Sequence, residues 1–161
     1  MSDSLETMAA PPVDAGSLTG NLLGIDFGTR VVGLAVAHPL TGSARPLSSI
    51  QYRQPSGLEQ AIRPVLRDWR PQLVVLGLPL DGAGEETPMS RRVRAFAAEL
   101  NAWLPDLALA FQDERLTSEA AARRFAERRG QGRARRRDAA ELDSLAAALI
   151  LEAWMKDHGL V

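Results

Sequence analysis

Two apolar runs near the N-terminus, separated by a short turn, constrain the fold of this chain more than any other feature. Residues Leu22–Phe27 are almost all apolar, and Val31–Ala37 are rich in residue types that favour strands. Between them lies only the segment Gly28–Arg30. Strands joined by so short a turn pair in antiparallel fashion. The sheet of this protein is therefore predicted to begin with a β-hairpin.

The segments after the hairpin alternate between strand and helix patterns. Strands are expected at 44–52, 73–78 and 107–111, and helices at 56–69, 88–104, 117–129 and 138–157. Pro46 indicates an edge position or a strand start, and Pro64 could bend or split the first helix. A meander followed by alternating helices and strands predicts an α/β fold, with a mixed sheet covered by helices.

Composition limits the kinds of protein that the chain can be. It has no cysteine and only two histidines, which excludes disulfides and thiolate zinc sites and argues against a multi-histidine zinc site. No apolar run reaches the roughly 18–20 residues that a membrane helix needs, so no membrane partner is expected. Residues 1–20 are small, polar and mildly acidic and do not resemble a secretory signal. We expect a disordered tail at 1–20, a single domain at 21–161 and a cytoplasmic location.

The net charge of −1 conceals a local excess of positive charge. Between residues 123 and 137 the chain has eight arginines and one acidic residue, Glu127. A basic patch on a nearly neutral domain is typical of proteins that bind nucleic acid. A solvated surface helix and loop is the alternative interpretation.

Asp26 interrupts an otherwise apolar strand. Its neighbours on the same strand face are Gly24 and Gly28, which have no side chains and leave room for a ligand. A carboxylate is costly to bury unless a positive charge compensates it. Asp26 is therefore predicted to belong to a functional site, with a turn residue at the strand end as the structural alternative.

Acidic residues at two other places could join Asp26. Asp113 and Glu114 follow the strand expected at 107–111 and would point to opposite faces, so the sequence does not choose between them. Asp143, on the last helix, has only alanines three and four residues away and so has no cation partner there. Together these carboxylates would form an oxygen-ligand site for Mg²⁺ or Mn²⁺, suited to phosphoryl transfer on nucleic acids.

Four segments resemble, in the same order, motifs of the YqgF/RuvX family. They are the hairpin 23–36, the Gly-Leu-Pro segment within 75–82, the Asp-Glu-Arg-Leu-Thr-Ser segment 113–118 and the helical segment 143–151. The resemblance implies an RNase H-like fold with a five-stranded mixed sheet. It also implies a metal-dependent nuclease that processes the 5′ end of pre-16S ribosomal RNA during ribosome biogenesis.

Carried over by position, the resemblance implies that Asp26, Glu114 and Asp143 are catalytic metal ligands, with Asp113 as an alternate. Two ions, Mg²⁺ or Mn²⁺, would activate water and stabilise the leaving oxygen. RNA is the expected partner, and structured DNA is a second one. The arginines expected to hold the phosphodiester backbone are Arg30, Arg115, Arg128, Arg129, Arg133, Arg135, Arg136 and Arg137.

Three other functions remain open at this point. A Holliday-junction resolvase would need two active sites on opposed strands and hence a dimer, and both a monomer and a homodimer fit the sequence. The segment 24–29 also resembles the phosphate-binding hairpin of actin-like ATPases and sugar kinases, although the chain has room for only one half of that duplicated fold. A non-catalytic RNA-binding regulatory factor is the third.

Overall fold

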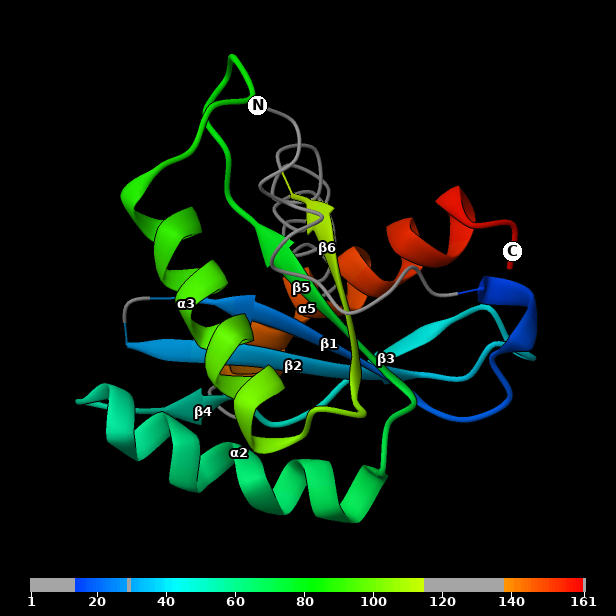
Figure 1. Cartoon of the computed structure of the whole chain (residues 1–161), viewed down its shortest axis with the longest axis horizontal. Coiled ribbons are helices and arrows are strands. Elements are labelled where there is room, and N and C mark those ends of the chain that lie inside the picture. Colours follow the sequence, from blue (N-terminus) through cyan, green and yellow to red (C-terminus); the bar gives the residue numbers. More distant parts are fainter. Residues whose placement is uncertain (1–13, 29, 115–137, 161) are drawn as a thin grey trace.

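The computed structural model describes residues 14–28, 30–114 and 138–160, with the backbone alone at 55–56 and 138–143. A six-stranded sheet lies between helices on both of its faces (Figure 1). The strands are β1 (Leu22–Phe27), β2 (Val31–Ala37), β3 (Ala44–Pro46), β4 (Ile50–Gln51), β5 (Leu73–Leu78) and β6 (Ala108–Asp113). The helices are η1 (Ala15–Ser17), α2 (Pro55–Trp69), α3 (Pro88–Trp103) and α5 (Asp138–Asp157).

The predicted hairpin is confirmed, and it leads into a mixed sheet of the expected kind. β1 pairs antiparallel with β2, whereas β1 with β5 and β5 with β6 pair in parallel. The strand order is β3-β2-β1-β5-β6, and β4 also pairs with β2. The carboxyl ends of the three parallel strands therefore meet at one edge of the sheet, which is where ligands bind in open α/β sheets.

The prediction of one continuous strand at 44–52 is wrong, because this segment forms β3 and β4, both paired with β2. β3 ends at Pro46, which has no N–H to donate. In the gap, the N–H of Leu47 donates to the carbonyl of Leu34 at 2.8 Å. The N–H of Leu34 donates to Ser144 Oγ at 2.9 Å. A side chain of α5 thus satisfies the backbone group that the broken strand leaves open.

The helices that the structure describes agree with the predicted ones. α2 continues through Pro64 without a break. α3 begins as expected at Pro88, where Thr87 Oγ1 accepts the N–H of Ser90 at 3.0 Å and Ser90 Oγ accepts the N–H of Thr87 at 2.8 Å. This reciprocal pair is a capping box. The helix expected at 117–129 and the basic segment 128–137 lie outside the described residues.

Two apolar layers, one on each face of the sheet, form the core. Ile25 and Leu76 belong to the layer under α2 and α3. Val75 and Ile150 belong to the layer under α5. Successive strand residues point to opposite faces, so odd and even positions of each strand can be assigned to one helix layer or the other.

Part of the segment predicted as a tail is attached to the sheet. Residues 14–20 include η1, and the N–H groups of Thr19 and Gly20 donate to Gln72 Oε1 at 2.7 and 2.6 Å. Residues 1–13 lie outside the described part of the chain. Among the helices that the structure describes, none has the length and apolar character required to cross a membrane.

Candidate active site

Asp26 lies on the sheet face that α5 covers. Two residues earlier, a Cβ on Gly24 would lie 2.7 Å from the carbonyl oxygen of Ala147 and 2.7 Å from Leu151 Cγ, both in α5. Residues two apart on a strand share a face. The half-buried side chain of Asp26 therefore points to the side of α5, near the carboxyl end of β1.

The carboxylate of Glu114 lies over Gly77 and beside Asp26. A Cβ on Gly77 would collide with Glu114 Oε2, so the carboxylate occupies the space that a side chain would fill. β1 and β5 run in parallel with Ile25 beside Leu76, and the next residues along these strands are Asp26 and Gly77. The missing side chain at Gly77 thus allows Glu114 to approach Asp26.

The surroundings of Glu114 favour its protonated, uncharged form. Burial, followed by the negative charge of Asp26 and a side-chain hydrogen bond with it, raises the pKa of Glu114 from its usual 4.5 to about 8. The charge of Asp113 acts in the same direction with a smaller effect. Two carboxylates so close repel each other unless a proton or a cation lies between them. This donor set suits a divalent cation with oxygen ligands.

Asp113 lies on the other face of the sheet. It pairs with Leu78, which belongs to the apolar layer under α2 and α3. Paired residues of neighbouring strands share a face, so the side chain of Asp113 is directed toward that layer. The N–H of Glu114 donates to the carbonyl of Leu78 at 3.4 Å. Of the two adjacent acids, the structure brings Glu114 to Asp26.

The backbone of Asp143 lies in the second turn of α5, beside the same strands, although its side chain lies outside the described residues. The next residue, Ser144, is fully buried and accepts the N–H of Leu34. Leu34 follows Gly33, which is the β2 partner of Asp26. α5 therefore passes over β2 one residue from the position that faces Asp26. Within the described part of the chain, no three acidic or histidine side chains are grouped as for a metal ion.

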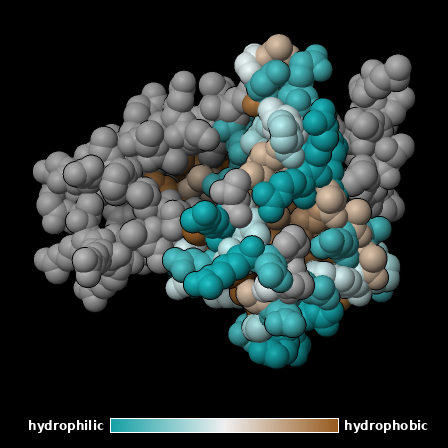
Figure 2. Space-filling model, turned by 90° about the vertical axis from the view of Figure 1, so that its left-hand side faces the viewer, coloured by the Kyte–Doolittle hydropathy of each residue, from teal (hydrophilic) through white to brown (hydrophobic). Residues whose placement is uncertain are grey.

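Arg30 is the one predicted phosphate contact that the structure describes. It is exposed and lies in the β1–β2 turn, directly before β2. Figure 2 shows the side of the molecule on which this turn lies, and most of its described surface is hydrophilic. The remaining predicted contacts, Arg115, Arg128, Arg129, Arg133, Arg135, Arg136 and Arg137, lie outside the described residues.

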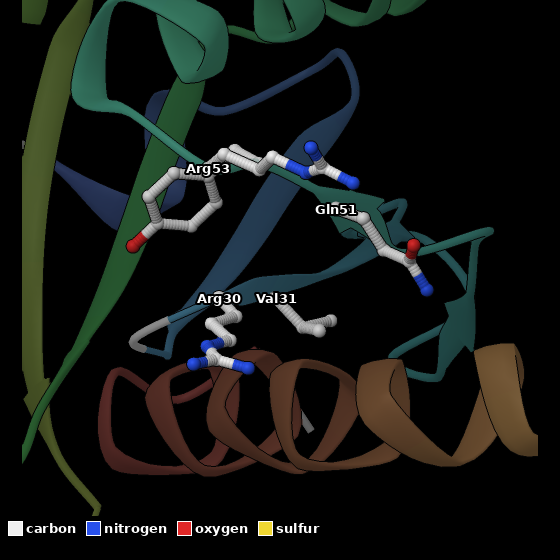
Figure 3. Close-up of a pocket in the computed structure, with 5 residues that line it drawn as sticks. Arg30, Val31, Gln51 and Arg53 are labelled. Atoms are coloured by element: carbon white, nitrogen blue, oxygen red, sulfur yellow. The ribbon is translucent and has the colours of Figure 1, made fainter.

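Three residues that were not predicted from the sequence line one pocket together with Arg30 (Figure 3). They are Gln51, Tyr52 and Arg53, at the end of β4 and directly after it. The register of β4 places Gln51 opposite Val31. The sequence gives no local signal for this contact, because β4 is only two residues long and its pairing depends on the break after β3.

The loop from Pro79 to Thr87 rises beside the carboxyl ends of β5 and β6 (Figure 1). Asp81 Oδ1 accepts the N–H groups of Ala83 and Glu85, both at 2.9 Å, and the hydroxyl of Thr87 donates to the carbonyl of Pro79 at 2.6 Å. These bonds fix the conformation of the loop that follows β5.

The model of one protein family, described as "RuvX: Holliday junction resolvase", matches residues 20–157. This chain belongs to the RuvX family. The resemblance of the four sequence segments is thereby confirmed. The matched range contains all the acidic residues and arginines considered above.

Bacterial relatives match over nearly the whole of their own length. A protein of Edwardsiella ictaluri named "Putative pre-16S rRNA nuclease" is 44% identical over 138 residues, covering 85% of this chain and 95% of the relative. A protein of the same name from Xanthomonas oryzae pv. oryzae is 39% identical over 144 residues, covering 88% of this chain and 92% of the relative.

Solved structures confirm the fold of this RuvX protein. Thermus thermophilus RuvC in complex with a Holliday junction substrate has a TM-score of 0.52 at 21% identity, covering 84% of this chain and 96% of that one. The yeast mitochondrial Holliday junction resolvase Ydc2 has a TM-score of 0.55 at 16% identity, and the match covers 97% of this chain and 85% of that one. The mixed sheet and its helices are therefore a RuvC-like RNase H fold.

Proposed function

We propose that this RuvX protein is a metal-dependent nuclease that hydrolyses phosphodiester bonds during 5′-end processing of pre-16S ribosomal RNA, in the cytoplasm. One observation carries the chemical part of this proposal, namely the Asp26–Glu114 carboxyl pair at the carboxyl ends of parallel strands. The names of the relatives support the RNA substrate.

The carboxyl pair fits a divalent cation. Negative charge on both Asp26 and Glu114 is unfavourable without a cation, as the raised pKa of Glu114 indicates. Both side chains have oxygen donors of the kind that Mg²⁺ and Mn²⁺ prefer. Asp143 would be the third ligand, because the residue after it, Ser144, binds Leu34, which follows the β2 partner of Asp26. Asp113, on the other face, stays the alternate. Bound there, the metal would activate water and stabilise the leaving oxygen.

The chain's own residues would position the substrate strand. Gly24 and Gly77 allow α5 and Glu114 to lie close to Asp26, so the carboxylates are held on rigid elements. Arg30 and the basic residues from Arg115 to Arg137 would hold phosphates by charge. Such contacts give affinity that falls with salt and little preference for sequence.

Cleavage of labelled RNA, duplex DNA and a four-way DNA junction in Mg²⁺ or Mn²⁺ tests the proposal. Wild type is expected to cleave the RNA, and Asp26→Asn is expected to abolish that cleavage. Asp106→Asn, which changes an exposed carboxyl group before β6, is the matched control and should cleave normally. Equal cleavage by Asp26→Asn and wild type would overturn the proposal.

A junction resolvase is the second candidate, because the family model carries that description. It predicts paired, symmetrical nicks in the four-way junction and a homodimer with two sites. A nuclease for RNA alone could act as a monomer or a homodimer. Nicks in the junction without RNA cleavage would move the substrate assignment to DNA.

A further inference from the structure

An open pocket of about 840 Å³ lies beside the β1–β2 turn. Among the described residues it is lined by Arg30, Val31, Gln51, Tyr52 and Arg53. Figure 3 shows Arg30 and Val31 on one side of the pocket and Gln51 and Arg53 on the other. The two arginines and Gln51 are exposed, whereas Tyr52 is buried.

Tyr52 holds the two sides of this pocket together. Its backbone N–H donates to the carbonyl of Arg30 at 3.0 Å, and its hydroxyl donates to the carbonyl of Gly28 at 2.6 Å. Arg92 in α3 donates to the same hydroxyl at 3.3 Å. Both ends of the β1–β2 turn are therefore fixed by one buried residue, the Arg30 end by its backbone and the Gly28 end by its side chain. The pocket is a preformed feature of the sheet.

Most other arginines in the described part of the chain have a structural role. Arg94 forms a two-bond ion pair with Glu86, with both distances at 2.8 Å. Guanidinium groups also lie over aromatic rings at 5.2 to 5.5 Å, as seen for Arg45 on Trp69, Arg63 on Trp103, Arg92 on Phe27 and Arg94 on Phe111. With the residues that the structure describes, neither Arg30 nor Arg53 makes an ion pair or a ring contact of this kind.

The described lining of the pocket is therefore positive and rich in donors. It contains two guanidinium groups and one amide and no carboxylate. Guanidinium groups present several N–H donors in a planar fork that matches the oxygens of a phosphate. Such a lining suits the negatively charged oxygens of a phosphodiester.

We propose that Arg53 and Gln51, together with Arg30, bind a phosphate of the substrate strand other than the one that is cleaved. This inference rests on the proposed nuclease function. β4 lies two strands away from β1, which corresponds to roughly 10 Å at the usual strand spacing. A strand that leaves the Asp26–Glu114 pair across the hairpin turn would bring a neighbouring phosphate to this pocket.

Binding of labelled single-stranded RNA and DNA, measured in the Asp26→Asn background so that nothing is cleaved, tests the inference. Arg53→Ala is expected to weaken binding by about threefold to tenfold and to lower the slope of log affinity against log salt by about one. Arg67→Ala, an exposed arginine of α2 outside the pocket, is the matched control and should bind like the parent. Thermal melting should show that both variants are folded.

Oligonucleotides in which one phosphate at a time is replaced by an uncharged methylphosphonate locate the contact. The parent should lose affinity at one phosphate besides the scissile one, and Arg53→Ala should be insensitive at that position. If this pattern is seen with DNA oligonucleotides and not with RNA, the pocket is supported and the phosphate that it binds belongs to DNA.

Arg53→Ala with parental affinity at every salt concentration, while Asp26→Asn still abolishes cleavage, would overturn the pocket and leave the nuclease proposal intact. Absence of binding and cleavage with both RNA and DNA would overturn both.

Discussion

Gly77 and Glu114 together bring two carboxyl groups close to each other at one end of the sheet. Gly77 has no side chain, so the Glu114 carboxylate can lie over the end of β5 and reach Asp26. The result is a half-buried pair of acids in which the pKa of Glu114 is raised. Its cost to the folded state is an electrostatic one, which a divalent cation would offset.

Glu114→Gln should change how stability depends on pH when metal is absent. Because folding raises the pKa of Glu114 from 4.5 to about 8, its contribution to stability is fully present below pH 4.5 and is lost as the pH rises through about 8. Urea unfolding of wild type in a chelator should therefore show a falling midpoint over this range, and Glu114→Gln a smaller fall. Glu99→Gln, an exposed glutamate of α3, should behave like wild type. If the unfolding midpoints of wild type and Glu114→Gln fall equally with pH, the raised pKa of Glu114 is contradicted.

Gly77→Ala should damage both stability and activity. The added methyl group would collide with the Glu114 carboxylate and with Ile150 Cδ1, at a cost of about 1–3 kcal/mol. Displacement of Glu114 should lower RNA cleavage by about tenfold to a hundredfold. Gly57→Ala is the control, since a Cβ there meets nothing within 4 Å and should stabilise α2. Full activity of Gly77→Ala would show that the position of Glu114 does not matter.

Helix α5 is held against the sheet at two places. It contacts β1 closely at Gly24, and its Ser144 accepts the one N–H that the break between β3 and β4 leaves open on β2. Asp143 directly precedes that serine. The height and register of this helix over the sheet therefore set how far Asp143 lies from Asp26.

Ser144→Ala should destabilise the protein by about 1–3 kcal/mol, because the buried N–H of Leu34 loses its acceptor. Chemical denaturation measures this cost. Cleavage assays should show a parallel loss of activity, because the part of α5 that contains Asp143 would be held less firmly against the sheet. Ser17→Ala changes an exposed serine whose hydroxyl donates to the nearby carbonyl of Asp14, and it should have little effect on either quantity. An unchanged unfolding free energy for Ser144→Ala would mean that this bond does not anchor the helix.

The elements that sequence patterns predicted well are those built from local contacts. The hairpin 22–37 follows from two apolar runs and a short turn, and α3 follows from Thr87 and Pro88. The break between β3 and β4 could not be predicted, because Pro46 marks only the end of β3 and an N–H that the break leaves on β2 is satisfied by Ser144, 110 residues away from Leu34. The pocket at Arg53 was missed for the same reason.

At the scale of the whole molecule, the mixed sheet brings the carboxyl ends of β1, β5 and β6 to one edge. Sequence reasoning identified Asp26 and the adjacent acids Asp113 and Glu114 as candidates from their places after apolar runs. It could not choose between Asp113 and Glu114, since the choice depends on the parallel register of Leu78 with Asp113. Three-dimensional pairing, which no local pattern records, supplies that information.

A divalent cation should stabilise the whole fold through this edge. At a metal concentration about 100 times the dissociation constant, the melting temperature of wild type should rise by about 5–10 °C. The rise should be larger at pH 8 than at pH 6, because the metal competes with protonation of Glu114, whose pKa is raised to about 8. Asp26→Asn should show almost no rise. Equal shifts for wild type and Asp26→Asn would place the bound metal elsewhere.

The proposal that Asp26 and Glu114 hold the catalytic metal is tested most directly by the dependence of RNA cleavage on Mg²⁺ concentration. The proteins to compare are wild type, Asp26→Asn, Glu114→Gln and Asp113→Asn. We predict saturable, metal-dependent cleavage by wild type, a loss of more than about 100-fold in Asp26→Asn and Glu114→Gln, and a loss below about tenfold in Asp113→Asn. Cleavage that persists in a chelator, or a loss in Asp113→Asn with none in Glu114→Gln, would contradict it.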